Sequence, residues 1–328
     1  MFTPLEKKQI LKLNGLLSQP LAIVFYHTQH KADVLFKDYC SALARLVPAI
    51  RVTVEQGAPD ELPSILLTDR LRYQALPSGN ELPPFLEALK AVGGSDWNGS
   101  QSMAVTRLAQ NRLPASLSLY IAPSCTYCPQ VVRRLLPLPL ENKHLELTVM
   151  DGTLFPEPAA DDGIQSVPTL LLDKQFRWTG SIPLNEVIEI INTREPASLG
   201  SSSLAAMIKE GQAQRLATMM LEDAKIFPAF YDLLTHKQWS LRLGAMVVLE
   251  TIAAENGGLA SEMLHPLRER FDEVSDQIKG DILYMFGEIG DPRATAWLQT
   301  VLSDNFDEEI KEAAEEALEK IGSPPDFS

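Results

Sequence analysis

The chain has 328 residues, of which 45% are hydrophobic and 22% are charged, and its formal net charge is −14 at pH 7. This is the composition of an ordinary globular protein with room for two or three domains. Residues 198–328 hold 23 Asp and Glu against 11 Lys and Arg. Nucleic acid binding needs clustered cations, so we expect no nucleic acid partner. With no apolar stretch of bilayer length and no secretory signal at its start, the sequence predicts a cytoplasmic protein without a membrane partner.

Two segments of the first two thirds share one order of elements. Apolar, β-type runs at residues 21–26, 51–54 and 62–67 accompany a helical stretch at 33–47. The order recurs with runs at 117–122, 145–150 and 167–172 and a helix at 125–136. Strand, helix, strand and then a proline-led strand is the order of a thioredoxin fold. The sequence therefore predicts an α/β part with two tandem thioredoxin-like folds.

Two linker-like runs divide the chain. Residues 93–100 and 196–203 are rich in Gly and Ser, a composition typical of connections between domains. A helical stretch is expected between the first run and Leu113. We therefore predict domains at 1–98, 99–197 and 198–328.

The last third has helical periodicity and no β signal. Three amphipathic segments begin at Leu241, Ile278 and Ile310, and Gly290 and Pro292 give stop and start signals between two helices. Such units stack because none of them buries its apolar stripe alone. These features resemble HEAT-like repeats, so an all-α repeat domain that docks partner proteins is expected.

The motif that carries chemistry is Cys125-Thr126-Tyr127-Cys128. Among three cysteines, two that are two residues apart indicate a reactive dithiol. With Ser124 as N-cap, Cys125 is predicted at the first helical position, where the helix dipole favours a nucleophilic thiolate. Cys128, one turn further and more buried, is predicted to be the resolving thiol.

Other interpretations of the cysteines are open to test. The pair could be half of a zinc site, although no second CxxC completes it. Cys40 lies on the apolar face of the helix at 33–47, so an inert buried thiol is expected there.

A proline-led strand follows the cysteine pair along the chain. In thioredoxin-like folds such a proline, here Pro168, is cis and lies beside the dithiol. The backbone of the preceding residue, here Val167, then pairs with an extended substrate peptide. Tyr127 either contacts the substrate or shields the disulfide.

Residues 1–195 resemble the glutaredoxin-like protein disulfide oxidoreductases with two tandem thioredoxin folds. They are also similar to the N-terminal domain of the flavoprotein component of alkyl hydroperoxide reductase. Thr126 replaces the proline of the glutaredoxin-type motif Cys-Pro-Tyr-Cys, at a position that tunes the reduction potential. In the first half, His27 and His30 stand where the cysteine pair is missing, and a solvated loop is expected there. The resemblance implies one active fold and one degenerate fold.

The expected function is thiol–disulfide exchange on protein disulfides by Cys125 and Cys128, with Thr126, Tyr127, Val167 and Pro168 positioning the substrate. No cofactor beyond the dithiol and no metal are expected, and the electrons come from a reductase that the sequence does not identify. Two alternatives remain: a redox-sensing scaffold, and a dedicated electron donor to one peroxidase or reductase.

Overall fold

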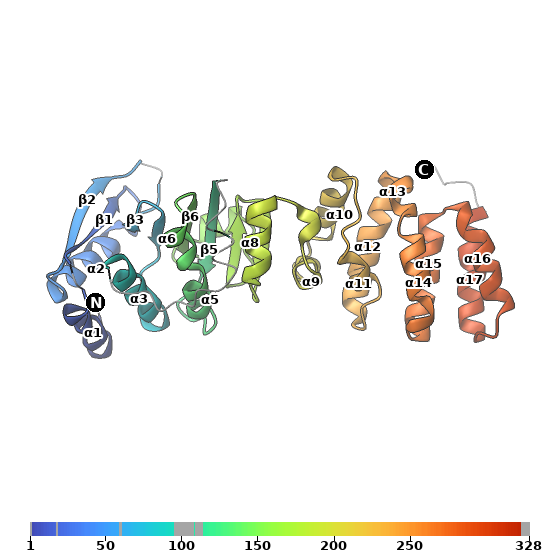
Figure 1. Ribbon diagram of the computed structural model, residues 1–328, viewed down its shortest axis with the longest axis horizontal. Coiled ribbons are helices and arrows are strands. Elements are labelled where there is room, and N and C mark those ends of the chain that lie inside the picture. Colours follow the sequence, from blue (N-terminus) through green and yellow to red (C-terminus); the bar gives the residue numbers. More distant parts are fainter. Residues whose placement is uncertain (1, 18, 59–60, 95–107, 109–113, 323–328) are drawn as a thin grey trace. The chain divides into compact units, whose positions relative to one another are not determined.

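A computed structural model describes residues 2–17, 19–58, 61–94, 108 and 114–322. The chain divides into two compact units, Met1–Arg194 and Glu195–Ser328. The first is an α/β unit and the second is helical (Figure 1). Apart from Leu108, the helical stretch expected before Leu113 lies outside the described residues, as does the boundary predicted at residue 98. Within the described ranges, no helix is long and apolar enough to cross a membrane.

The described strands of the first unit form one eight-stranded sheet with the order β2-β1-β3-β4-β6-β5-β7-β8. The strands are β1 Leu21–His27, β2 Ile50–Gln56, β3 Ser64–Thr68, β4 Leu71–Gln74, β5 Ala115–Ile121, β6 Leu145–Asp151, β7 Thr169–Leu172 and β8 Phe176–Thr179. β1 pairs parallel with β2 and antiparallel with β3, and β5 pairs in the same way with β6 and β7. The parallel pairing of β4 with β6 joins the two halves into one sheet.

Helices cover this sheet and bury its core. They are α1 Pro4–Leu11, α2 Asp33–Leu46, α3 Leu82–Val92, α5 Cys128–Leu135, α6 Pro137–Glu141, α7 Pro156–Asp161 and α8 Leu184–Thr193, with 3₁₀ turns η1 Lys12–Gly15 and η2 Gly79–Glu81. α2 turns Phe36, Cys40 and Leu43 inward at helical spacing. Cys40 is 1% exposed, and burial raises the pKa of its thiol to about 12. The expectation of a buried thiol at Cys40 is confirmed.

The second unit consists of paired helices. They are α9 Ser201–Lys209, α10 Ala213–Glu222, α11 Phe230–Leu234, α12 Trp239–Glu255, α13 Gly257–Ser261, α14 Leu264–Arg270, α15 Asp276–Ile289, α16 Thr295–Ser303 and α17 Glu308–Gly322, with η3 Pro196–Ser198, η4 Phe271–Glu273 and η5 Pro292–Ala294. α11 packs on α12, α14 on α15 and α16 on α17, while α15 also contacts both α12 and α17 (Figure 1). Gly290 ends α15 with a φ of 66°, a left-handed conformation that favours glycine.

A buried ion pair joins two of these helices. The side chain of Arg242 on α12 is 0% exposed and pairs with Asp281 on α15, and its Nη1 donates a hydrogen bond of 2.6 Å to the carbonyl of His236. An Arg242→Ala substitution leaves the carboxylate without its partner and should lower the free energy of unfolding by about 3 kcal/mol. Urea denaturation followed by helical circular dichroism measures this effect. Lys225→Ala on the surface is the control, and an equal effect of the two substitutions would contradict the prediction.

Candidate functional site

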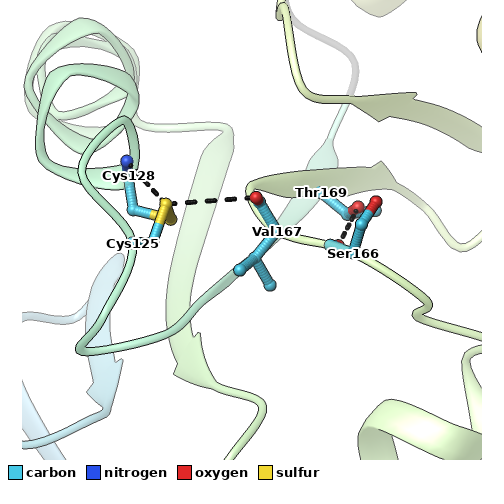
Figure 2. Close-up of a disulfide and its surroundings, with 5 residues drawn as sticks. All are labelled: Cys125, Cys128, Ser166, Val167 and Thr169. Atoms are coloured by element: carbon cyan, nitrogen blue, oxygen red, sulfur yellow. Dashed lines mark hydrogen bonds between the residues drawn. A yellow bond between two sulfur atoms is a disulfide. The ribbon is translucent and has the colours of Figure 1, made fainter.

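The two cysteines lie where β5 passes into α5. After Ile121 the chain turns, and the helix begins at Cys128, so the prediction of a helix starting at Cys125 is wrong. Ser124 does not cap the helix. The backbone N–H of Cys128 donates to Sγ of Cys125 at 3.0 Å instead (Figure 2). The sulfur thus accepts an N–H three residues ahead, as a capping side chain does.

The two cysteine residues differ in exposure. Cys125 and Cys128 form a disulfide with Cα atoms 5.6 Å apart. Cys125 is half-buried, whereas Cys128 is 0% exposed. Pro129 lies in the first turn of α5, where no N–H is needed for the helical ladder. An outside partner can therefore reach Cys125 but not Cys128.

The segment before β7 lies against Cys125. The carbonyl oxygen of Val167 is 3.9 Å from Sγ of Cys125 (Figure 2), and the bond from Val167 to Pro168 is cis. The turn is fixed on both sides: Thr169 Oγ1 donates to the carbonyl of Ser166 at 2.8 Å, and the N–H of Gly180 donates to the carbonyl of Pro168 at 2.9 Å. The structure thus brings Val167 and Pro168 beside the disulfide.

The two residues between the cysteines point outward. The side chain of Tyr127 is 73% exposed and Thr126 is also exposed. An aromatic ring of this exposure has most of its surface free for contact with a partner.

A buried carboxyl that the sequence did not indicate lies near α5. Glu81 ends η2, which packs against α5, and it is 5% exposed. Its Oε1 has no hydrogen-bond partner among the described residues. Burial raises the pKa of Glu81 to about 7, the charge of Asp151 adds to this, and Arg133 opposes it. Glu81 therefore takes up or releases a proton near neutral pH.

The described residues contain no group of three or more His, Cys, Asp or Glu side chains that could hold a metal ion. Within those residues, nothing completes a zinc site around Cys125 and Cys128.

The fold and the cysteine site together define the class of protein. Residues 117–192, which run from β5 to α8 and include both cysteines and Pro168, match the family model described as Thioredoxin domain. The chain thus contains a thioredoxin-like domain.

Two curated relatives are AhpF components of alkyl hydroperoxide reductases. The Escherichia coli protein is 22% identical over 182 residues, which cover 54% of this chain and 35% of the relative. The Pseudomonas putida protein is 27% identical over 127 residues, which cover 39% of this chain and 24% of the relative. The chain thus spans about a third or less of the length of these relatives.

Two solved structures share the fold. One is the N-terminal domain of alkyl hydroperoxide reductase AhpF from Enterococcus faecalis, with a TM-score of 0.51, 19% identity, and coverage of 58% of this chain and 100% of that one. The other is a protein disulfide oxidoreductase from Aeropyrum pernix, with a TM-score of 0.51, 15% identity, and coverage of 58% and 93%. At these identities the likeness shows the fold.

Proposed function

We propose that the chain is a thiol–disulfide oxidoreductase that acts on protein disulfides through Cys125 and Cys128. One observation carries the proposal: a reachable sulfur at the head of a helix accepts a backbone N–H and is bonded to a fully buried second sulfur. In the reduced protein the same N–H and the helix dipole stabilise a thiolate on Cys125.

The exchange takes two steps. The thiolate of Cys125 attacks one sulfur of the substrate disulfide, a mixed disulfide forms, and the other substrate sulfur leaves as a thiolate that takes a proton. Cys128 then attacks Sγ of Cys125, which forms the intramolecular disulfide and releases the second substrate thiolate. The substrate gains two electrons and the dithiol loses two. A separate dithiol reductase returns them, and the chain itself needs no further cofactor.

The second step needs a proton acceptor inside the protein. A thiol without solvent exposure does not ionise easily, since burial disfavours the charged form. Glu81, on the turn that packs against the helix of Cys128, is buried, has a free oxygen and has a pKa raised to about 7 by burial. We assign to Glu81 the role of taking the proton of Cys128.

The substrate lies beside the disulfide as an added strand. The Val167 backbone next to Cys125 offers a peptide main-chain hydrogen bonds, and Pro168 holds that backbone in place. Tyr127 and Thr126, exposed between the cysteines, contact the substrate side chains.

The activity is tested by the reduction of insulin disulfides with the full chain and a thiol reductant. We expect turnover that is unchanged in a Cys40→Ser variant, because Cys40 is buried in the core away from the site. No acceleration over the reductant alone would refute the assignment.

The proposal extends to the domain organisation of the chain. We propose two tandem thioredoxin-like folds, 1–98 and 99–197, of which the first lacks the cysteine pair and supports the second, and a HEAT-like repeat domain at 198–328. The repeated strand pairing supports the first part, and the stacked helix pairs support the second. The proposal places the protein in the cytoplasm, where a dithiol is kept reduced.

The helical unit offers a surface for docking the substrate protein or the reductase. Trp239, Leu243 and Val247 lie at four-residue steps on α12 and are 53%, 40% and 44% exposed. On α15, Tyr284 is 45% exposed and donates a hydrogen bond of 2.8 Å to Glu250 of α12. In the described part of the second unit, all exposed large apolar side chains lie on these two helices. Such clusters mark protein interfaces.

A double substitution tests the docking surface. Trp239→Ser with Leu243→Ser should leave insulin reduction unchanged and lower the yield of a trapped natural partner by about tenfold, since losing one or two anchors costs about 1–2 kcal/mol or more. Leu5→Ser with Leu11→Ser, two exposed apolar residues of α1, is the matched control. Equal yields from both double variants would exclude the docking role.

The similarity of the chain to its curated relatives favours a second candidate function. The AhpF components of alkyl hydroperoxide reductases are similar to this chain, so the dithiol would pass electrons to one dedicated peroxidase. Slow reduction of insulin together with fast transfer to a single trapped peroxidase would favour this function over general disulfide reduction.

A further inference from the structure

The first half of the sheet carries a pocket at the place where the second half carries its cysteines. In the second half the cysteine pair lies between β5 and α5, and the corresponding segment of the first half runs from β1 to α2. A pocket of about 430 Å³ opens there. It is lined by Phe25, His27, His30, Lys31, Asp33, Val34, Lys37 and Val54.

The ring of His27 is held in one orientation. Its Nδ1 lies 2.7 Å from Oδ2 of Asp33, and Oδ1 of the same carboxylate accepts the N–H of Thr28 at 2.8 Å. Asp33 is 8% exposed, and both of its oxygens are therefore engaged. With Nδ1 held by the carboxylate, Nε2 is the ring nitrogen of His27 left for a ligand.

The second histidine is fixed with the opposite hydrogen-bonding pattern. Nδ1 of His30 accepts the N–H of Ala32 at 3.1 Å, and the ring packs against Phe155 with centroids 5.3 Å apart. Because Nδ1 accepts, the proton of the neutral ring is on Nε2. His30 thus offers an N–H donor.

Two lysines give the pocket wall more positive than negative charge. Lys31 and Lys37 are exposed, and within the described ranges neither forms an ion pair. The carboxylate of Asp33 is the acidic group of the lining, and His27 and Thr28 already occupy it. The lining therefore has two cations against one carboxylate, together with the N–H of His30.

An apolar surface adjoins these groups. Val34 on α2 and Val54 on β2 are 56% and 62% exposed, and Phe25 closes the inner wall. The volume falls in the range of small-molecule sites, in which apolar walls surround a few placed polar groups.

We propose that this pocket binds a small organic anion. Lys31, Lys37 and Nε2 of His30 hold its carboxylate or phosphate group, and Val34 and Val54 contact its apolar part. The carboxylate of Asp33 fixes His27 at the rim. Binding at this pocket does not involve the dithiol, so the anion site and the proposed oxidoreductase activity are tested independently.

Calorimetric titration of the full chain with phenylacetate and with phenyl phosphate tests the site, with benzyl alcohol as the neutral probe. We expect saturable binding of one or both anions and none of the alcohol, and the tighter anion identifies the group that the pocket prefers. Binding should weaken at least tenfold in a Lys31→Gln, Lys37→Gln double variant. A Lys7→Gln, Lys8→Gln variant, which loses the same charge from α1, should bind as the wild type does.

Three results would overturn the proposal: no saturable binding of either anion at millimolar concentration, equal affinity for benzyl alcohol, or equal affinity in the two double variants. Insulin reduction should be unchanged in the Lys31→Gln, Lys37→Gln variant. If neither anion binds but insulin is still reduced, the proposed anion site is refuted and the proposed oxidoreductase activity is unaffected.

Discussion

A Cys125→Ser variant should reduce insulin no faster than the uncatalysed background, a loss of about 10³-fold or more. Serine keeps the size of the side chain but has no ionisable sulfur, and removal of a nucleophile in a covalent mechanism removes most of the rate. The N–H of Cys128 and the dipole of α5 remain, yet they have no thiolate to stabilise. Insulin turbidity with a fixed excess of reductant measures the rate.

Two further cysteine variants complete the comparison. Cys128→Ser keeps the attacking sulfur of Cys125. It should form the mixed disulfide with the substrate but fail to release the substrate from it. Cys40→Ser should behave as wild type. A Cys125→Ser protein that retains the wild-type rate would show that the reaction does not begin at this sulfur.

A Glu81→Gln variant should slow the resolving step about a hundredfold, the usual scale of general base catalysis. The wild-type rate should rise with pH through the pKa of Glu81, which burial raises to about 7, because the ionised carboxylate accepts the proton of Cys128. Glutamine fills the same space without accepting a proton, so the inflection near this pH should vanish. Stopped-flow measurement of the rate at which the Cys125–Cys128 disulfide forms, between pH 5 and 9, tests this prediction. An unchanged profile in the variant would exclude this role.

The same substitution should change how stability depends on pH. The ordinary pKa of this carboxyl is 4.5 and burial raises it to about 7 in the folded protein, so the folded state binds the proton more tightly. Relative to the ionised carboxylate, the protonated carboxyl of Glu81 favours the folded state. This contribution to the free energy of unfolding is fully present below pH 4.5 and is lost as the pH rises through about 7. The wild type should therefore lose more stability than Glu81→Gln between about pH 5 and 8, as measured by thermal unfolding.

The cysteine pair, the strands around it and the place of Val167 and Pro168 followed from local sequence. Alternating apolar runs and a proline before the strand are local signals, and the structure has β5, β6 and β7 within two residues of the predicted runs. The start of α5 differs from the prediction: Cys125 lies in the turn before the helix, and its sulfur accepts the N–H of Cys128 at the head of the helix. Sequence rules for helix caps consider oxygen acceptors, so they favour the serine.

Long-range features could not be predicted from the sequence. The joining of the halves depends on β4 pairing with β6, and β4 is short and separated from its partner by a long stretch of chain. Glu81 looks like an acidic residue before an apolar helix, and its burial follows from tertiary packing, in which η2 contacts both α3 and α5. The sequence predicts a solvated loop at His27 and His30, and the structure has an exposed His27 followed by a loop from residue 28. In the structure they line a pocket because Asp33 and the N–H of Ala32 fix their rings.

Trapping with a Cys128→Ser variant tests the central claim most directly. The variant keeps the reachable sulfur of Cys125 and lacks the one that displaces the substrate, so a partner disulfide should remain attached. Non-reducing electrophoresis and peptide mass spectrometry should show an adduct through Cys125 that disappears on reduction and is absent from the Cys125→Ser, Cys128→Ser double variant. No adduct, or an adduct through Cys40, would contradict the account.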